Sequence, residues 1–182
     1  MKYFKILIAP VLLVLGVFIA IACEPDDICP EGTATTPRLI IELYDVSYPD
    51  SRKNVSDLVV IGVGNNSVLT GYSFVDTDEV LLPLKTDDNT TQYALIANAS
   101  VNDNGTPDDE SDDFIEGNQD IISISYSREE IYVSRACGYK TIYKNVTLTI
   151  EDDGDNWMLS RQPITDNQSV ENENEAHFIV SH

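Results

Sequence analysis

The densest group of potential metal ligands in this sequence is an acidic stretch over residues 103–113. Its carboxylates surround a glycine turn at Gly105, and they are Asp103, Asp108, Asp109, Asp112 and Asp113. Calcium takes about six to eight oxygen ligands, and carboxylates a few residues apart around a turn can converge on one ion. The stretch is therefore a candidate calcium site, and no other cofactor is suggested. The alternative is a solvated, self-repelling loop.

A second candidate site combines aromatic and basic side chains on an otherwise acidic chain. Its members are Tyr132, Arg135, Tyr139, Lys140 and Tyr143. This concentration predicts a partner surface, and because aromatic faces stack on sugars, an envelope protein and a glycan are both candidate partners. The alternative is that these tyrosines, at alternating strand positions, form core or cross-strand pairs.

No group of residues has the pattern of a catalytic centre. A nucleophile needs an adjacent base, usually histidine, but the two histidines, His177 and His182, lie close to the C-terminus and no Gly-x-Ser-x-Gly motif occurs. A carboxylate pair of the glycosidase kind carries no information among 31 acidic residues. We therefore expect a protein that is not an enzyme, with His177 as a hydrogen-bonded strand residue.

The charge balance excludes one class of partner. The formal net charge is −20, from 31 acidic and 11 basic residues, whereas nucleic-acid binding depends on Lys and Arg neutralising phosphates. A basic partner, a divalent cation or colloidal repulsion is compatible with this charge, and a nucleic-acid partner is not expected.

Cys23 follows a segment with the composition of a signal peptide. Lys2 and Lys5 precede an apolar run that ends in Ala22, the small residue that lipoprotein signals place before a lipidated cysteine. We predict a lipoprotein signal peptide over residues 1–22 and acyl chains on Cys23, which would hold the protein to a membrane. The alternatives are an ordinary signal peptide and a transmembrane anchor, for which about 20 apolar residues are needed.

Two further cysteines remain once Cys23 is lipidated, namely Cys29 and Cys137. An even number of cysteines in an oxidising envelope predicts a disulfide. Closing a loop of about 100 residues is worth about 4.7 kcal/mol in chain-entropy models. The alternative is a pair of buried thiols kept apart by the fold.

The elements that must position these residues are strands. Short runs of alternating apolar and polar residues are separated by Asn, Asp, Gly and Pro turns, and no stretch has helical periodicity. We predict an all-β domain over residues 37–182, an antiparallel immunoglobulin-like β-sandwich of about eight strands, after a lipidated tether over residues 23–36. A closed barrel is the alternative.

Several strands carry specific expectations. Leu39, Ile41 and Leu43 alternate with Arg38, Glu42 and Tyr44, which predicts a half-buried strand. Residues 58–63 are continuously apolar, which predicts a strand buried on both faces, and Pro83 assigns residues 80–84 to an edge or a bulge. Residues 122–126 and 131–134 are expected to form a hairpin around 127–129. A turn at Asp153-Gly154 is expected to pair residues 141–150 with the residues after it.

Four segments carry a resemblance: Thr36-Pro37-Arg38-Leu39-Ile40-Ile41-Glu42, Val133-Ser134-Arg135-Ala136-Cys137-Gly138-Tyr139-Lys140, residues 26–31 and residues 173–177. In these the chain resembles an uncharacterised family of Bacteroidetes-type cell-envelope lipoproteins, a domain of unknown function. The resemblance implies lipidation of Cys23 and pairing of Cys29 with Cys137. It supplies no catalytic residue.

Together these observations predict a lipid-anchored, non-enzymatic binding or assembly module of the cell envelope. The acidic pair Asp26-Asp27 resembles the signal that exports such lipoproteins to the outer face of the outer membrane, which predicts a surface-exposed location. The alternative function is a calcium-stabilised adhesion or glycan-binding module.

Overall fold

The computed structural model describes residues 28–33, 35–166 and 168–182. The predicted signal peptide and Cys23 lie outside these residues. The described residues divide into two units, one formed by residues 28–33 and 132–139 and the other by residues 35–131, 140–166 and 168–182. We call the described residues of the first unit, 28–33 and 132–139, the tip, and the second unit the sandwich. No helix in the described part of the chain is long and apolar enough to span a membrane.

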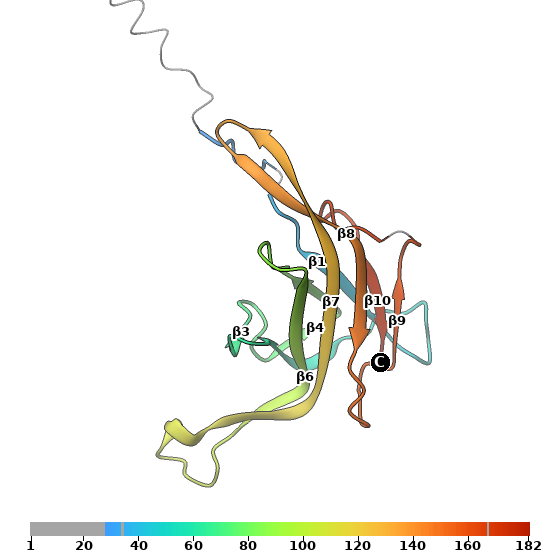
Figure 1. Ribbon diagram of the computed structural model, residues 1–182. Helices are drawn as coiled ribbons and strands as arrows, with labels where there is room; N and C mark the ends of the chain where they lie inside the picture. The colour runs from blue at the N-terminus through green and yellow to red at the C-terminus, as the bar shows by residue number, and fades with distance from the viewer. Residues whose placement is uncertain (1–27, 34, 167) are drawn as a thin grey trace, which may run out of the picture. The chain divides into compact units, whose positions relative to one another are not determined.

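The described residues form an all-β fold with ten strands in two sheets (Figure 1). The four-stranded sheet has the order β5 (Glu79–Leu82), β1 (Leu39–Tyr44), β10 (Phe178–Ser181), β9 (Ser160–Pro163). The six-stranded sheet has the order β3 (Ser67–Val68), β2 (Val55–Gly62), β6 (Thr90–Asn102), β7 (Phe114–Ser134), β8 (Gly138–Ile150), and β4 (Val75–Thr77) also pairs with β2. A 3-10 turn, η2 (Glu110–Asp112), precedes β7. Two such sheets are consistent with a β-sandwich.

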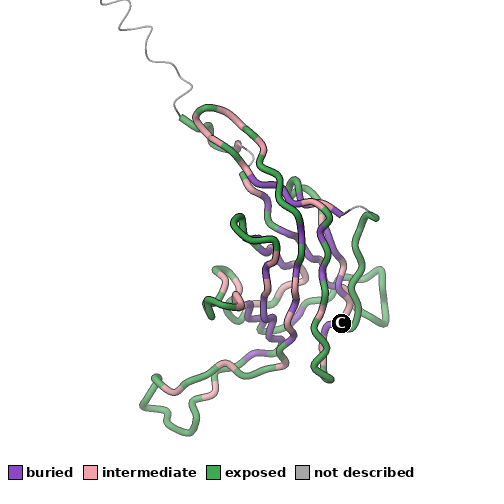
Figure 2. Tube along the Cα trace, in the orientation of Figure 1, coloured by how far each residue is buried: buried purple, intermediate pink, exposed green. Residues whose placement is uncertain are grey.

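The core of the sandwich is formed by alternate residues from both sheets (Figure 2). Leu39, Ile41 and Leu43 of β1 are buried against the same cluster as Ile122 and Ile124 of β7. Burying one such side chain contributes about 1.5–3 kcal/mol, so the alternating pattern drives the packing of one sheet on the other.

Three strand predictions are confirmed. Residues 39–44 form β1, and β5 ends at Leu82, beside Pro83, at one edge of its sheet. In β2, Leu58 and Val60 face the main core, while Val59 packs with Ile96 and Ala99 in a second cluster. The run over residues 58–63 is therefore apolar because both faces of β2 are covered.

The expected hairpin at residues 127–129 is wrong, because β7 is one continuous strand of 21 residues. The connection Ser127-Arg128-Glu129 contains no glycine, proline or asparagine that would favour a turn. Neighbouring segments also hold it extended: the Arg128 guanidinium donates to Asn89 Oδ1 at 2.9 Å, and Ser127 Oγ donates to the Lys144 carbonyl at 3.2 Å.

The expected hairpin at Asp153-Gly154 is also wrong. The chain turns there, but it passes to the other sheet, where β9 pairs with β10. The fully buried Asp120 carboxylate accepts the backbone N–H groups of Trp157 at 3.3 Å and Met158 at 2.8 Å. The segment after the turn therefore bonds to a side chain instead of to β8.

The expectation of a purely antiparallel sandwich needs one correction. Strand β10 pairs with β1 in parallel, with Ile41 opposite Phe178 and Leu43 opposite Val180. A parallel pair requires a long connection, and here most of the chain separates the two strands. No local pattern in the sequence signals such a pair.

Left-handed residues interrupt the alternation inside long strands. Asp57, Asn98 and Asn145 have φ values of 47°, 49° and 52°, and the register shifts around the first two. Asparagine and aspartate adopt this conformation more readily than most residues, and an extra residue in a strand turns the following side chains to the opposite face. In β8, Tyr143 and Val146 consequently both face the core, although they are three positions apart.

Candidate functional site

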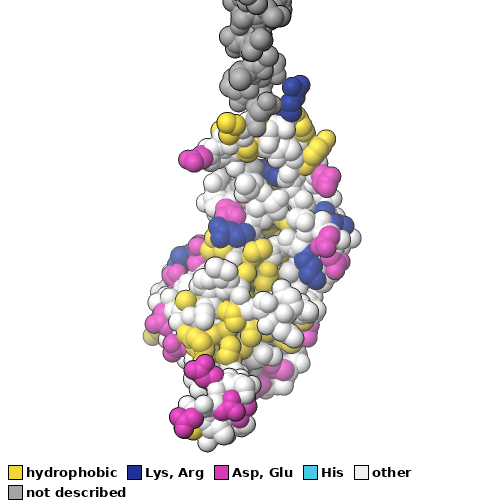
Figure 3. Space-filling view, turned by 90° about the vertical axis from the view of Figure 1, so that its left-hand side faces the viewer, with side chains coloured by type: hydrophobic (Ala, Val, Ile, Leu, Met, Phe, Trp, Pro, Cys, Tyr) yellow, Lys and Arg dark blue, Asp and Glu magenta, His cyan; other side chains and the backbone are white. Residues whose placement is uncertain are grey.

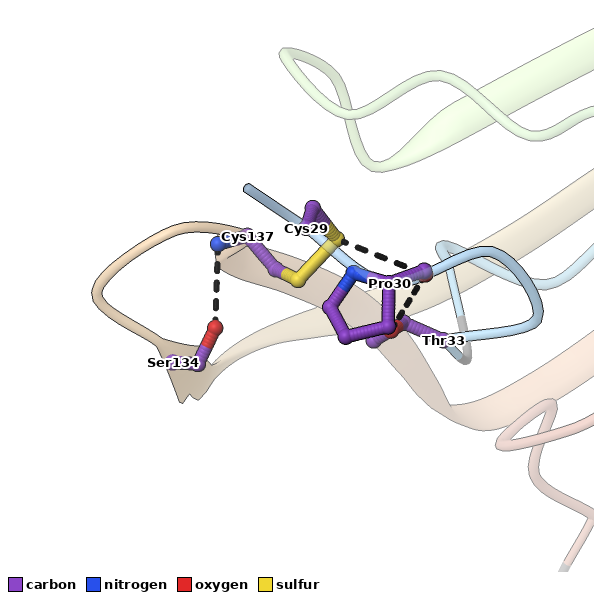
Figure 4. The surroundings of a disulfide bond; sticks show 5 residues. All are labelled: Cys29, Pro30, Thr33, Ser134 and Cys137. Carbon is purple, nitrogen blue, oxygen red and sulfur yellow. Dashed lines mark hydrogen bonds between the residues drawn. A yellow bond between two sulfur atoms is a disulfide. The ribbon is translucent and has the colours of Figure 1, made fainter. Parts of the chain in front are cut away.

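The tip contains the disulfide predicted from the sequence. Strand β7 ends at Ser134 and β8 begins at Gly138, and the connecting loop contains Cys137, which is bonded to Cys29 with a Cα–Cα distance of 4.8 Å (Figure 4). The Cys137 N–H donates to Ser134 Oγ at 3.0 Å. On the other side of the bond, the N–H and hydroxyl of Thr33 both donate to the Pro30 carbonyl.

Exposed aromatic rings flank this disulfide in sequence. Tyr132 and Tyr139 are 59% and 67% exposed, and their rings meet edge to face with centroids 5.4 Å apart. Ile28, next to Cys29, is 79% exposed. The described tip has one carboxylate, Glu31, and one guanidinium, Arg135, and therefore no net formal charge.

The other members of the predicted aromatic and basic patch belong to the sandwich. Tyr143 is fully buried, its hydroxyl donates to the Leu84 carbonyl at 2.9 Å, and burial raises its pKa to about 12. Tyr143 is therefore a core residue, and its inclusion in a partner surface is wrong. Lys140 Nζ lies 3.5 Å from the Glu171 carbonyl.

A pocket of about 300 Å³ lies in the sandwich beside β3. Its apolar wall comes from three short segments between residues 62 and 93, and its members are Val63, Val68, Leu69, Pro83, Leu84 and Tyr93. Figure 3, which views the side where β3 lies, shows hydrophobic side chains gathered on this face with acidic side chains near its borders. Such clusters on an exposed surface mark binding sites more often than chance would give.

Hydrogen bonds hold the pocket wall in place. The Tyr93 hydroxyl donates to the Pro83 carbonyl at 2.5 Å, and burial raises the pKa of Tyr93 to about 12. The Leu69 N–H donates to the Val60 carbonyl at 2.8 Å, and the Val63 N–H to the Gln92 carbonyl at 3.1 Å. These bonds join the loop after β2 to β2 and β6, so the pocket is part of the folded sheet.

Two polar side chains at the pocket can orient a ligand. Lys85 Nζ lies 3.9 Å from Asp88 Oδ2, both side chains being largely exposed, so this ion pair is weak. Gln92 also lines the pocket, and its side-chain amide donates to Glu151 Oε1 at 3.0 Å. The arrangement can accept an apolar group that carries an anionic end near Lys85.

A second, more open cleft of about 550 Å³ contains Arg38 and Arg52. Arg52 pairs with Glu42 at 2.5 Å, Glu79 at 3.2 Å and Asp78 at 3.6 Å, and Arg38 pairs with Glu173 at 2.6 Å. Hydrogen bonds to these carboxylates raise the pKa of both guanidinium groups. Their charge is compensated within the protein, so this cleft is a weaker candidate for an anion.

The acidic loop is held by hydrogen bonds within itself. Asp103 Oδ1 accepts the Gly105 N–H at 3.0 Å, and Asp109 Oδ1 accepts the N–H and hydroxyl of Ser111. Asp112 accepts from the Thr106 hydroxyl and the Asn104 amide. The hydrogen bonds lower the pKa values of Asp109 and Asp112. These two carboxylates act here as turn-stabilising groups.

The structure brings no three carboxylate, histidine or cysteine groups of the described residues together in a way that could hold a metal ion. All five predicted calcium ligands lie in the described part of the chain. Calcium binding by Asp103, Asp108, Asp109, Asp112 and Asp113 stays a prediction.

His177 is a structural residue of the sandwich. The residue is buried, and its ring Nδ1 accepts the backbone N–H of Ile40 at 2.9 Å. The backbone N–H of His177 in turn donates to the Ile40 carbonyl at 2.9 Å. Because Nδ1 accepts, the ring is neutral in this arrangement, and burial lowers its pKa. His177 thus joins β1 to the segment that leads into β10.

Residues 57–182 match a family described as a family of unknown function, DUF6452. The chain belongs to this family. The match covers the pocket and Cys137 but begins after Cys29. Searches of curated proteins and of solved structures gave no significant match.

The pocket was missed from the sequence because its wall comes from residues 62–70, 83–85 and 91–93. None of these short segments has a recognisable ligand motif, and only strand pairing joins them. The turn sequence at residues 64–66, a glycine followed by two asparagines, is the one local pattern near the pocket. It predicts a turn and gives no indication of a binding site.

Proposed function

We propose that this chain is a lipid-anchored, non-enzymatic binding module of the bacterial outer membrane, and that its sandwich takes up an apolar group of another envelope component. The observation that carries the binding role is the pocket beside β3, where an apolar wall meets polar side chains such as Lys85 and Gln92. Ligand sites have this composition, and about 300 Å³ is at the lower end of their usual volume.

The pocket volume and chemistry suggest the kind of group that binds. Burial of apolar surface contributes about 25 cal/mol per Å², so covering about 100 Å² would provide about 2.5 kcal/mol. An anionic group beside Lys85 would set the orientation of the ligand. A short acyl chain or an aromatic group with an acidic end matches both requirements.

The binding role can be tested with 1-anilinonaphthalene-8-sulfonate, a fluorescent apolar anion. The test variant is Val68→Asp, which places a carboxylate in the pocket lining at a residue that is 40% exposed. Val46→Asp is the matched control, because Val46 is 46% exposed and lies outside the pocket lining. We expect Val68→Asp to weaken probe binding about tenfold, the equivalent of about 1.4 kcal/mol, and the control to bind like the parent. Equal binding by all three proteins would contradict the proposal.

The anchor is supported by the sequence alone, through the signal peptide over residues 1–22, Cys23 and the tether over residues 23–36. The test is expression with radiolabelled palmitate followed by membrane fractionation. The parent protein is expected to be labelled and membrane-bound, and Cys23→Ala is expected to be neither. An unprocessed Cys23→Ala protein that stays in the membrane would contradict lipid anchoring.

We also propose the finer fold assignment, an immunoglobulin-like connection of the two sheets. The two-sheet architecture and the shared core support it. Contacts between backbone amides of neighbouring strands, measured by nuclear magnetic resonance, would test it, since strand neighbours unlike those of immunoglobulin domains would exclude it.

A further inference from the structure

We infer that the tip is a membrane-contacting surface, with Ile28, Tyr132 and Tyr139 at the lipid–water interface of the membrane that anchors the chain. The inference rests on the proposed lipid anchor at Cys23. It assigns to the aromatic pair a lipid surface, where the sequence predicted an envelope protein or a glycan.

Chain length brings the tip close to the anchor. Cys29 is six positions after Cys23, and an extended chain spans at most about 3.6 Å per residue, so the two lie within about 22 Å of each other. Cys29 is covalently bonded to Cys137, which is 108 residues further along the chain. The disulfide therefore holds the loop between β7 and β8 within reach of the same membrane surface.

The exposed side chains have the chemistry of the interface. Tyrosine has an apolar ring and a polar hydroxyl, and it is enriched where hydrocarbon meets water. Tyr132 and Tyr139 place two such rings together, and Ile28 adds an apolar side chain beside Cys29. These three residues would leave water on contact with lipid headgroups and the upper acyl region.

Charge also favours the tip over the rest of the chain as the membrane-facing surface. The described tip has no net formal charge, whereas the whole chain has −20. A membrane with anionic lipids has a negative surface potential that repels acidic surfaces. The tip itself adds nothing to this repulsion, and the acidic residues that the anchor brings to the surface are those of the tether, Glu24, Asp26 and Asp27.

The test measures the depth of a tryptophan in vesicles. The processed lipoprotein is reconstituted into phosphatidylcholine vesicles with or without brominated acyl chains, which quench nearby indoles. Trp157→Phe removes the only native tryptophan, and Tyr132→Trp adds a reporter at the tip. The matched control is Tyr48→Trp, at an exposed tyrosine of the sandwich.

We expect brominated lipid to quench the emission of the Tyr132→Trp protein, because tryptophan is enriched at the membrane–water interface, and to leave the emission of the Tyr48→Trp control nearly unchanged. Replacing both Cys29 and Cys137 with serine should reduce the quenching to the control level while the protein stays anchored. Circular dichroism of each variant verifies that it is folded.

The failures of the two proposals are distinguishable. An anchored protein whose Tyr132→Trp emission is unaffected by bromine would overturn the inference and leave the lipid anchor intact, and the tip would then be available to a protein partner. Equal quenching of both reporters would also overturn it. Membrane association that does not require Cys23 would instead refute the anchor.

Discussion

Each of the two units contains a pair of tyrosine rings in contact, one buried and one exposed. In the sandwich, Tyr126 and Tyr143 meet edge to face with ring centroids 4.9 Å apart, and in the tip Tyr132 and Tyr139 meet in the same way at 5.4 Å. The sandwich pair is buried, and its hydroxyls contact Thr91 and the Leu84 carbonyl. The tip pair is exposed.

The difference shows that ring geometry alone does not reveal what a tyrosine pair does. Edge-to-face contact contributes about 0.5–1.5 kcal/mol beyond area burial. In the sandwich this adds to the burial of two large side chains, whereas in the tip most of the ring surface stays in water. We therefore expect the first pair to determine stability and the second to be available for binding.

The largest expected effect is on removal of a ring from the sandwich pair. Tyr143→Ala would leave a cavity in the core, and deletion of a large buried aromatic side chain costs about 3–5 kcal/mol. Urea denaturation monitored by Trp157 fluorescence would measure the loss. Tyr139→Ala is the control in the tip and should change the unfolding free energy by less than about 0.5 kcal/mol; similar losses for both would undermine the comparison.

The disulfide is expected to have the next largest effect. Replacing Cys29 and Cys137 together with serine removes a constraint across 108 residues of the unfolded chain, and such losses are typically about 2–4 kcal/mol. The urea midpoint of the double variant, compared with that of the parent under oxidising conditions, gives the value. An unchanged midpoint would mean that the bond positions the tip without stabilising the sandwich.

A smaller loss is expected from Tyr143→Phe, which keeps the ring and removes the hydroxyl. The Leu84 carbonyl would lose its donor in a buried site, at a cost of about 1–3 kcal/mol. Tyr132→Phe in the tip should leave the free energy of unfolding almost unchanged, because Tyr132 is largely exposed and water solvates its hydroxyl in both the folded and the unfolded state. Thermal unfolding of both variants checks this, and a destabilised Tyr132→Phe protein would show that the tip pair is structural.

The smallest expected effect is a dependence of folding stability on pH. It should come from the sandwich, which contains both histidines of the chain. Burial lowers the pKa of His177 and of His182 in the folded protein. The unfolded state therefore binds more protons below about pH 6.5, and stability should decrease as pH falls through this range, by about 1.4 kcal/mol per unit of pKa depression at most.

His177→Asn tests the share of one histidine. The side-chain oxygen of the introduced asparagine can accept the Ile40 N–H but does not titrate. The slope of stability against pH between 7 and 5.5 should therefore be shallower than in the parent. The remaining slope would come from His182. An unchanged slope would exclude His177 as the titrating group.

The sequence predicted the features that depend on local pattern. Alternation of Leu39, Ile41 and Leu43 located β1, Pro83 located the sheet edge, and the cysteine count led to the bond between Cys29 and Cys137. Each is encoded within a few residues or in a count, and tertiary context did not override it.

Three features could not be read from the sequence, because each depends on distant partners. The continuity of β7 through Ser127-Arg128-Glu129 is supported by hydrogen bonds that Ser127 and Arg128 donate to Lys144 and Asn89. The change of sheet after Asp153-Gly154 depends on the buried Asp120. The burial of Tyr143 depends on other segments that cover it, among them Leu84, whose carbonyl accepts the Tyr143 hydroxyl.

By itself the sequence determined an all-β chain, its acidic charge, its disulfide and the location of its exposed acidic loop, because composition and short-range periodicity control these properties. Only the tertiary structure decided that β1 and β10 pair in parallel, that residues from 62–93 enclose a pocket, and that Tyr139 is exposed while Tyr143 is buried. The physical reason is that burial is a property of contacts between distant segments. Tyr143 lies in the core of the sandwich, whereas Tyr139, four positions earlier on the same strand, belongs to the tip and stays exposed.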